Sequence, residues 1–133
     1  MESEGDFLRA VDGANTVETL LPAAWTVVSA EGGSLEDLVT WVSARPAKCL
    51  GLEARKGAIK MGCDADLVVF DPETAWTVGG NREDGQGPSS EASPYEGRQL
   101  RGVVLKTYVR GRCVFDVDGG HHVEGGVGRL VVS

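Results

Sequence analysis

The sequence has no long apolar run and little positive charge, and each shortage excludes a class of protein. No stretch approaches the roughly 20 apolar residues that span a bilayer. Lysine and arginine number 13 against 20 aspartates and glutamates, so the net charge is −7, and no basic stripe is present to hold phosphates. The first ten residues, MESEGDFLRA, lack the basic and apolar regions of a signal peptide. Membrane-spanning, nucleic-acid-binding and secreted proteins are therefore not expected.

Cysteine and histidine are also scarce. The cysteines, Cys49, Cys63 and Cys113, are odd in number and not closely spaced, which favours a reduced chain and a cytoplasmic location. We expect them to be buried and inert, because no histidine neighbours any of them. His121 and His122 are adjacent, and neighbours on an extended chain point to opposite faces, so they are not expected to share a metal ion. The sequence has no nucleophile elbow or phosphate loop, and we predict no self-contained catalytic set.

The 133 residues are enough for one modest domain, and the first part of it has helical periodicity. A first helix is predicted within residues 15–30, with Pro22 in its first turn. Its expected inner face is formed by Val17, Leu20, Leu21, Ala24 and Val28.

A second helix is predicted to begin at Ser34, which can form a capping box with Asp37. Its expected core-facing stripe is Leu35, Leu38, Val39 and Val42. The helix should stop at Arg45, because the residue before a proline disfavours helical backbone. A short helix should then open at Pro46 and end at Gly51.

From residue 56 onward the pattern changes to turns and strands. Strands are predicted in KGAIKMG (56–62) between two turns, at 66–70, at 74–78, at 101–110, at 112–117 and in RLVV (129–132). Asp71-Pro72 should stop the strand before it, and Gly111 should turn a hairpin. Residues 79–93 carry no large apolar side chain and are expected to form a polar loop.

Helices and strands are segregated rather than alternating, which predicts an α+β class. The expected division is a helical segment, 1–52, followed by a partial β domain, 53–133. Segregation excludes a complete doubly wound or (β/α) barrel domain within this chain. The few strands would leave open sheet edges, which suggests that part of the structure is missing.

Asp64 and Asp66 stand just before the predicted strand at 66–70 and invite a chemical interpretation. Two carboxylates in this position could be a metal site, an acid/base pair, or a structural pair at the start of a strand with no chemical role. Residues two apart in a strand point the same way, but no histidine or cysteine ligand set accompanies them. Because aspartate is favoured in turns for its local hydrogen bonds, a turn-capping or solvent-facing pair is the favoured interpretation.

Three stretches resemble the metal-dependent amidohydrolase superfamily, in that family's order. KGAIKMGCDADLVVFD resembles the place where the chain leaves the (β/α)8 barrel and enters a small β-sandwich. SARPAKCLGL resembles the helix upstream, and YVRGRCVF resembles the closing hairpin. The resemblance implies that 1–52 are the last helices of an amidohydrolase barrel and 53–133 part of the sandwich. It also implies that the acids of DAD do not bind the metals.

Two further stretches are similar to the allantoinase branch of the cyclic amidohydrolases. They are EGDFLRAVDGANTVETLLPAAWT and SPYEGRQLRGVVLKTYVRGR, and the final GRLVV fits the same branch. Enzymes of this branch use two zinc ions to open allantoin to allantoate in purine catabolism. The sequence departs from the branch at Gly13-Ala14 and in the acidic stretch REDGQGPSSEA. A dihydropyrimidinase or hydantoinase, whose N-G-V-E is close to the NTVE of this chain, is the alternative.

The resemblance also assigns roles within the chain. The family's histidines, carboxylated lysine and aspartate lie upstream of this segment, so no residue here is expected to be catalytic or to bind metal. Asn15, with Gly13 just before it, matches a position whose backbone contacts the cyclic amide of the substrate. The chain is thus expected to be the carboxyl-terminal portion of a longer homotetrameric enzyme, and inactive alone. A non-catalytic interaction module on the same scaffold is the remaining alternative.

Overall fold

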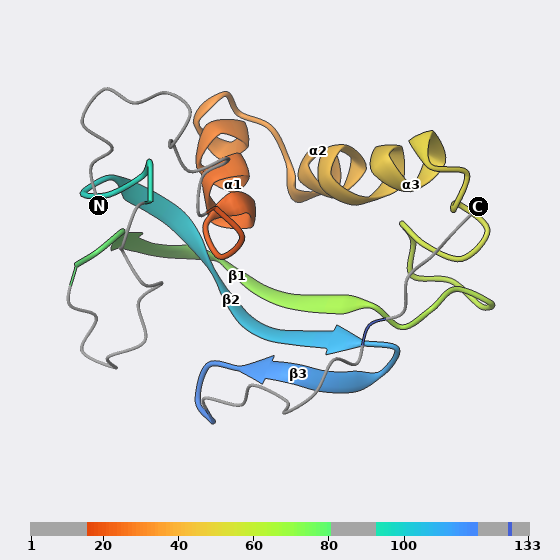
Figure 1. The fold of residues 1–133 in the computed structure, drawn as a ribbon. Coiled ribbons are helices and arrows are strands. Elements are labelled where there is room, and N and C mark those ends of the chain that lie inside the picture. The colour runs from red at the N-terminus through yellow and green to blue at the C-terminus, as the bar shows by residue number, and fades with distance from the viewer. Residues whose placement is uncertain (1–15, 81–92, 120–127, 129–133) are drawn as a thin grey trace, which may run out of the picture.

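The computed structural model describes residues 16–80, 93–119 and 128, which form an α+β unit (Figure 1). An antiparallel sheet in the order β1-β2-β3 carries helix α1 on one face, and a second helical segment extends away from α1. The elements are α1 (Leu20–Ala30), α2 (Leu35–Val39), the π-helical turn η2 (Thr40–Ala44), α3 (Arg45–Cys49), β1 (Leu67–Thr77), β2 (Gln99–Val109) and β3 (Arg112–Asp116). The predicted α+β class is confirmed, whereas the division into 1–52 and 53–133 stays a prediction.

Helix α1 has Pro22 in its first turn, as predicted, where a missing N–H leaves no helical hydrogen bond unmade. Its buried side is formed by Pro22, Trp25 and Val28, each three residues after the last. The predicted inner face is wrong in part, because Val17 and Leu20 are exposed. The periodicity argument left Pro22 and Trp25 out of the inner face, although both are buried here.

Helix α2 begins with the predicted capping box. The N–H of Ser34 donates to the Asp37 carboxylate at 2.9 Å, and the N–H of Asp37 donates to the Ser34 hydroxyl at 3.2 Å. These reciprocal bonds satisfy two backbone donors that have no partner within the helix. They also hold the pKa of Asp37 below its ordinary value, because the carboxylate accepts from the backbone and the side chain of Ser34.

Replacing Ser34 with alanine should lower the free energy of unfolding by about 1 kcal/mol, because the N–H of Asp37 loses its acceptor. Chemical denaturation of the two proteins, followed by circular dichroism, measures the difference. Ser34→Asp is the matched control, since aspartate is an equally good N-cap. A loss that is the same for both variants would show that capping is not what Ser34 contributes.

The second helix does not stop at Arg45, contrary to the prediction. It passes through η2, where the N–H of Arg45 donates to the carbonyl of Thr40 five residues earlier, and continues into α3 with Pro46 in its first turn. A proline ring clashes with the carbonyl four residues before it, and the wider π turn relieves this clash. Residues 35–49 therefore form one helical arm, which ends before Gly51 as predicted.

One continuous strand, β1, replaces the two strands predicted on either side of Pro72. The strand continues through the proline, and its register against β2 shifts between Asp71 and Ala75. Within this bulge the Asp71 carboxylate accepts the N–H of Glu73 at 2.9 Å and the hydroxyl of Thr74 at 2.6 Å. The predicted stop is wrong because an irregular stretch of strand can accommodate a residue that donates no ladder hydrogen bond.

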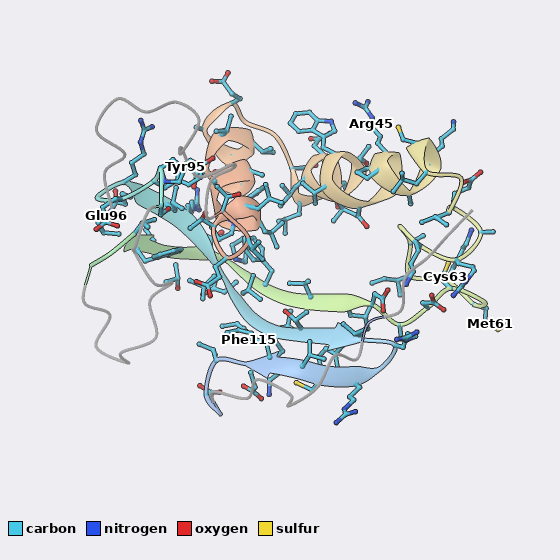
Figure 2. All side chains as sticks on the ribbon, in the orientation of Figure 1. Arg45, Met61, Cys63, Tyr95, Glu96 and Phe115 are labelled. Carbon is cyan, nitrogen blue, oxygen red and sulfur yellow. The ribbon has the colours of Figure 1, made fainter. Side chains whose placement is uncertain are left out.

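Other predicted β segments have mixed outcomes. Residues 56–62 form turns and bends instead of a strand. Ile59 and Met61 are almost fully exposed, so their alternation marks no buried face. Figure 2 shows Met61 at the edge of the molecule. The predicted strand at 129–132 lies outside the described residues. So does most of the predicted polar loop at 79–93.

Strands β2 and β3 form the predicted hairpin around Gly111. Arg110 and Gly111 have φ values of 49° and 79°, the two positive angles of a type I′ turn. Glycine adopts such an angle without steric penalty, which is why the turn falls here. The hairpin confirms the interpretation of YVRGRCVF as two strands and their connection.

Two buried clusters hold the described residues together. The first is formed by Trp76 in β1, Val78 just after it, and Leu100 and Val103 in β2. Trp25, Val28 and Leu38 form the second, with the ring of Phe70 packed against it, and so join both helical segments to β1. No helix within the described ranges is both long enough and apolar enough to cross a membrane.

Candidate functional site

The two predicted substrate-binding residues, Gly13 and Asn15, lie outside the described residues. Thr16 follows Asn15 directly. The carbonyl of Thr16 accepts the N–H groups of Thr19 and Leu20 at 3.1 and 2.8 Å, and the side chain of Thr19 is almost completely buried. Thr16, which follows Asn15 in the sequence, is therefore held by the turn that leads into α1.

Helix α1 is held to the sheet by an indole hydrogen bond. Nε1 of Trp25 donates to the carbonyl of Pro72 in the irregular part of β1 at 2.8 Å. The ring itself is buried in the cluster with Val28 and Leu38. Because the indole has a single donor, burial without this acceptor would leave it unsatisfied.

The hydroxyl of Thr26 makes the second link between α1 and the sheet. It donates to the carbonyl of Pro22 at 2.7 Å and accepts the N–H of Arg101 in β2 at 2.7 Å. One oxygen thus satisfies a helix carbonyl and a strand amide 75 residues away. No local pattern indicated this role, although Trp25 and Thr26 both lie in a stretch that carries the family resemblance.

Gly102 allows the helix and the sheet to approach closely at these links. Its φ is 97°, and a Cβ atom built there would overlap the ring of Phe70 and lie 3.0 Å from Cδ1 of Trp25. Its carbonyl accepts Nε1 of Trp76 at 2.9 Å, so both buried tryptophans meet this part of the sheet. The links made by Trp25, Thr26 and Gly102, here called the α1–sheet junction, set the position of α1.

Asp64 and Asp66 are brought together with basic side chains rather than with other metal ligands. Asp64 pairs with Arg55 at 3.0 Å and with Lys56 at 2.9 Å. Asp66 pairs with the same Lys56 and accepts the N–H of Arg110 at 2.8 Å. These contacts fasten the loop after the helical arm to the β2–β3 turn, and we call these five residues the ion-pair latch.

The electrostatics of the latch agree with a structural role. The ammonium group of Lys56 holds the pKa of both carboxyls below the ordinary value of 3.8, and the N–H of Arg110 adds to the effect on Asp66. The same contacts raise the pKa of Lys56 above 10.5. A general acid or base works best with a pKa near the operating pH, and these groups are all shifted away from it. The latch does not fit acid/base chemistry.

The latch does not fit a metal site either. In the ranges the structure describes, no three side chains of histidine, cysteine, aspartate or glutamate are grouped so that they could hold an ion. The oxygens of Asp64 and Asp66 face cations that already neutralise them. Of the alternatives left open by the sequence, these contacts support a turn-capping pair, because Asp66 accepts the N–H of Arg110 in the β2–β3 turn.

Neutralising Lys56 should reduce thermal stability at pH 7 and lose its effect in acid. Both carboxyl pKa values are lowered by folding, so their contribution is present above pH 3.8 and disappears as the pH falls through the lowered values. The raised pKa of Lys56 makes the complementary contribution disappear as the pH rises above 10.5. Melting curves of Lys56→Met and the parent between about pH 2 and about pH 11 measure this dependence.

Lys48→Met is the control for this titration, because Lys48 lies on the exposed side of α3. Its melting temperature should follow that of the parent at every pH. If Lys56→Met and Lys48→Met shift alike, the latch contributes nothing to stability.

The three cysteines are free, and none of them is fully buried as predicted. Cys63 and Cys113 are half-buried, and their thiols lie 3.8 Å and 3.2 Å from the carbonyls of Ala54 and Phe115. A thiol is a weak donor, so contacts of this kind are packing interactions. Cys49, the last residue of α3, is exposed, so the prediction of a buried side chain is wrong there and holds only in part for the other two.

Comparison with known proteins places these features in a family. The family model described as "Amidohydrolase family" matches residues 3–114. The allantoinase of Streptomyces avermitilis is 42% identical over 109 residues, which are 82% of this chain and 24% of that protein. The allantoinase of Arabidopsis thaliana is 39% identical over 132 residues, which are 98% of this chain and 25% of that protein.

A solved structure of a related enzyme also matches the chain. The L-hydantoinase (dihydropyrimidinase) of Arthrobacter aurescens matches with a TM-score of 0.65 and 31% identity, over 86% of this chain and 24% of that one. The chain therefore spans about a quarter of the length of the relatives that it matches.

Proposed function

This chain belongs to the amidohydrolase family, and on that basis we propose that it is the carboxyl-terminal portion of an allantoinase-like cyclic amidohydrolase. The observation that supports the substrate assignment is a modest difference in identity: 42% and 39% to two allantoinases, against 36% to the dihydroorotase of Anaplasma phagocytophilum and 32% to the D-hydantoinase of Rhizobium radiobacter. The reaction would be hydrolysis of the cyclic amide of allantoin to give allantoate. Because the chain is about a quarter of its relatives in length, this activity belongs to a longer polypeptide.

Zinc is the metal that the family resemblance implies, and the described residues do not fit it. The carboxylates that sequence reasoning singled out are paired with Arg55 and Lys56, and no described group of side chains makes up a ligand set. When bound in the longer enzyme, the two ions would lower the pKa of a water molecule and polarise the ring carbonyl. The part played by this chain is positional. A homotetrameric assembly and a cytoplasmic location belong to the same proposal.

The positional part centres on the segment that carries Gly13 and Asn15. Thr16 follows this segment and opens the turn that leads into α1, and α1 is fixed by the α1–sheet junction through Trp25 and Thr26. A backbone contact from Asn15 to the cyclic amide depends on where the chain enters the helix and not on the asparagine side chain. Small displacements of substrate-positioning groups reduce turnover strongly. The junction would therefore act on substrate affinity and turnover through α1.

A substrate comparison tests the proposal. The polypeptide encoded in frame with this chain, if it carries a His-x-His segment upstream, should be assayed on allantoin, dihydrouracil and a hydantoin. We expect kcat/KM for allantoin to exceed the others by at least about tenfold, in keeping with the loss when polar groups of a substrate do not match the site. Preference for dihydrouracil or a hydantoin would overturn the allantoinase assignment and leave the family assignment intact.

A dihydropyrimidinase or hydantoinase is the second candidate, and its support is the structural likeness to the Arthrobacter aurescens enzyme, at a TM-score of 0.65. A coding sequence with no upstream barrel would favour the third possibility, a non-catalytic interaction module. In that case the isolated 133-residue chain should show one cooperative thermal transition, since a module must fold alone.

A further inference from the structure

Three noncovalent contacts close a ring where α1 meets the irregular part of β1. Nε1 of Trp25 donates to the carbonyl of Pro72 at 2.8 Å. The next residue, Glu73, accepts a hydrogen bond from the guanidinium group of Arg101 at 2.6 Å. The backbone N–H of Arg101 donates in turn to the hydroxyl of Thr26, which follows Trp25. These five residues, here called the junction ring, join α1, β1 and β2 in one closed set of contacts.

The ion pair of Glu73 and Arg101 holds a stretch of β1 that the sheet itself does not hold. The paired residues of β1 and β2 pass from Asp71 directly to Ala75, so residues 72–74 have no partner in the ladder between these strands. The carbonyl that accepts the Trp25 indole lies within this stretch. The position of that acceptor therefore depends on side-chain contacts, and the Glu73–Arg101 pair reaches across to β2.

The pair is too exposed to act chiefly through stability. The side chains of Glu73 and Arg101 are 75% and 42% exposed, and ion pairs in contact with solvent contribute little to the free energy of unfolding. A planar guanidinium group instead fixes direction, because its donors form a rigid fork. The contact therefore determines where the irregular part of β1 lies more than whether the chain folds.

We propose that Glu73 and Arg101 are positioning residues for the substrate. Their ion pair sets residues 72–74, whose carbonyl holds Trp25, and the N–H of Arg101 holds Thr26, so α1 takes one position. This inference rests on the proposed function, in which the segment before Thr16 contacts the cyclic amide through its backbone. Loss of the pair should weaken binding of the substrate and of the transition state alike, which raises KM and leaves kcat nearly unchanged.

The test uses the polypeptide encoded in frame with this chain, assayed on the cyclic amide that it hydrolyses fastest. Glu73→Gln should raise KM about two- to fivefold in about 0.1 M salt, with kcat within about twofold of the parent. The difference should shrink in about 1 M salt, because the Debye length falls from about 10 Å to about 3 Å and the parent pair is screened. Exchanging the charges, as Glu73→Arg with Arg101→Glu, should restore the parent KM at the lower salt concentration.

Asp116→Asn is the matched control for this measurement. Asp116 pairs with Lys106 between β3 and β2, outside the junction ring, so its replacement should leave KM and the salt dependence of KM as in the parent. Equal changes in KM for Glu73→Gln and Asp116→Asn would overturn the proposal. So would a rise in KM that persists in full at the higher salt concentration, or one that the charge exchange does not reverse.

Hydrogen exchange separates this inference from the proposed function. If the polypeptide hydrolyses no cyclic amide, the proposed function fails, and the hold on α1 is then measured by exchange of the N–H groups of residues 16–26. Faster exchange in Glu73→Gln than in the parent and in Asp116→Asn upholds the role of the pair in positioning α1, since a helix held less firmly opens more often. Unchanged exchange overturns it. A preference for a cyclic amide other than allantoin counts against the allantoinase assignment alone.

Discussion

Replacing Gly102 with valine should lower the free energy of unfolding by more than about 3 kcal/mol, enough to unfold much of the chain. Two effects combine. At φ 97° the backbone of a β-branched residue is strained even where there is room for its side chain. Here there is no room either, because the added Cβ would overlap the Phe70 ring. The side chain would also push against Trp25 and so separate α1 from β2. The variant should therefore lose the α1–sheet junction as a whole.

Denaturant unfolding followed by tryptophan fluorescence measures this effect, since Trp25 and Trp76 both lie beside Gly102. Gly128→Val is the matched control. Gly128 has no heavy atom within 4 Å of its built Cβ and is exposed, so a side chain there meets open space. Its free energy of unfolding should stay within about 0.5 kcal/mol of the parent, as for an ordinary surface substitution. A Gly102→Val protein as stable as this control would show that helix and sheet do not approach as described.

Replacing Trp25 with alanine should lower the free energy of unfolding by about 3–5 kcal/mol. The indole is only 7% exposed, and its removal leaves a cavity among Val28, Leu38 and Phe70. It also leaves the carbonyl of Pro72 without the donor that it has in the parent. Trp25→Phe separates these effects, because phenylalanine keeps most of the ring volume and should lose only about 1–3 kcal/mol for the unsatisfied carbonyl.

Trp41 provides the comparison for Trp25, because it lies on the helical arm and is 51% exposed. Trp41→Ala in the isolated chain should change stability by less than about 1 kcal/mol. Equal losses for the two tryptophans, measured by the same denaturant titration, would contradict the placement of α1 on the sheet.

Local sequence signals identified the elements that local interactions make. The capping box of Ser34 and Asp37 needs only a short run of consecutive residues, and the hairpin at Gly111 needs a glycine between two alternating segments. Both predictions are confirmed for this reason. Pro22 in the first turn of α1 is confirmed on the same grounds, since the missing N–H of proline is a property of the residue itself.

The predictions that failed depended on distant parts of the chain. Which face of α1 is buried depends on Pro72 and Arg101, which lie far along the sequence and receive or donate the hydrogen bonds of Trp25 and Thr26. A proline signals interruption locally, but at Pro46 a π turn and at Pro72 a bulge allow the element to continue. Propensity gives the tendency of a residue, and tertiary contacts decide whether it is followed.

The candidate site shows a similar limit. Sequence spacing placed Asp64 and Asp66 beside each other, but it could not show that Lys56 pairs with both or that Arg110 reaches Asp66 from the hairpin turn. The ammonium group of Lys56 lies 10 residues from Asp66 and the backbone N–H of Arg110 lies 44 residues from it, and a search along a short window does not find such partners. Leu35, Val39 and Val42 are also predicted to face a core, and that prediction is wrong in the described structure, where they are 41%, 52% and 40% exposed and only Leu38 of the stripe is buried.

Zinc content and ring-opening activity of the isolated chain, measured on the same preparation, test the central claim most directly. That claim is that the groups that activate water lie outside these 133 residues. After dialysis against zinc and desalting, elemental analysis should find no stoichiometric metal, and allantoin should not be converted to allantoate above the rate without protein. Two firmly held ions per chain together with turnover of allantoin would contradict the account.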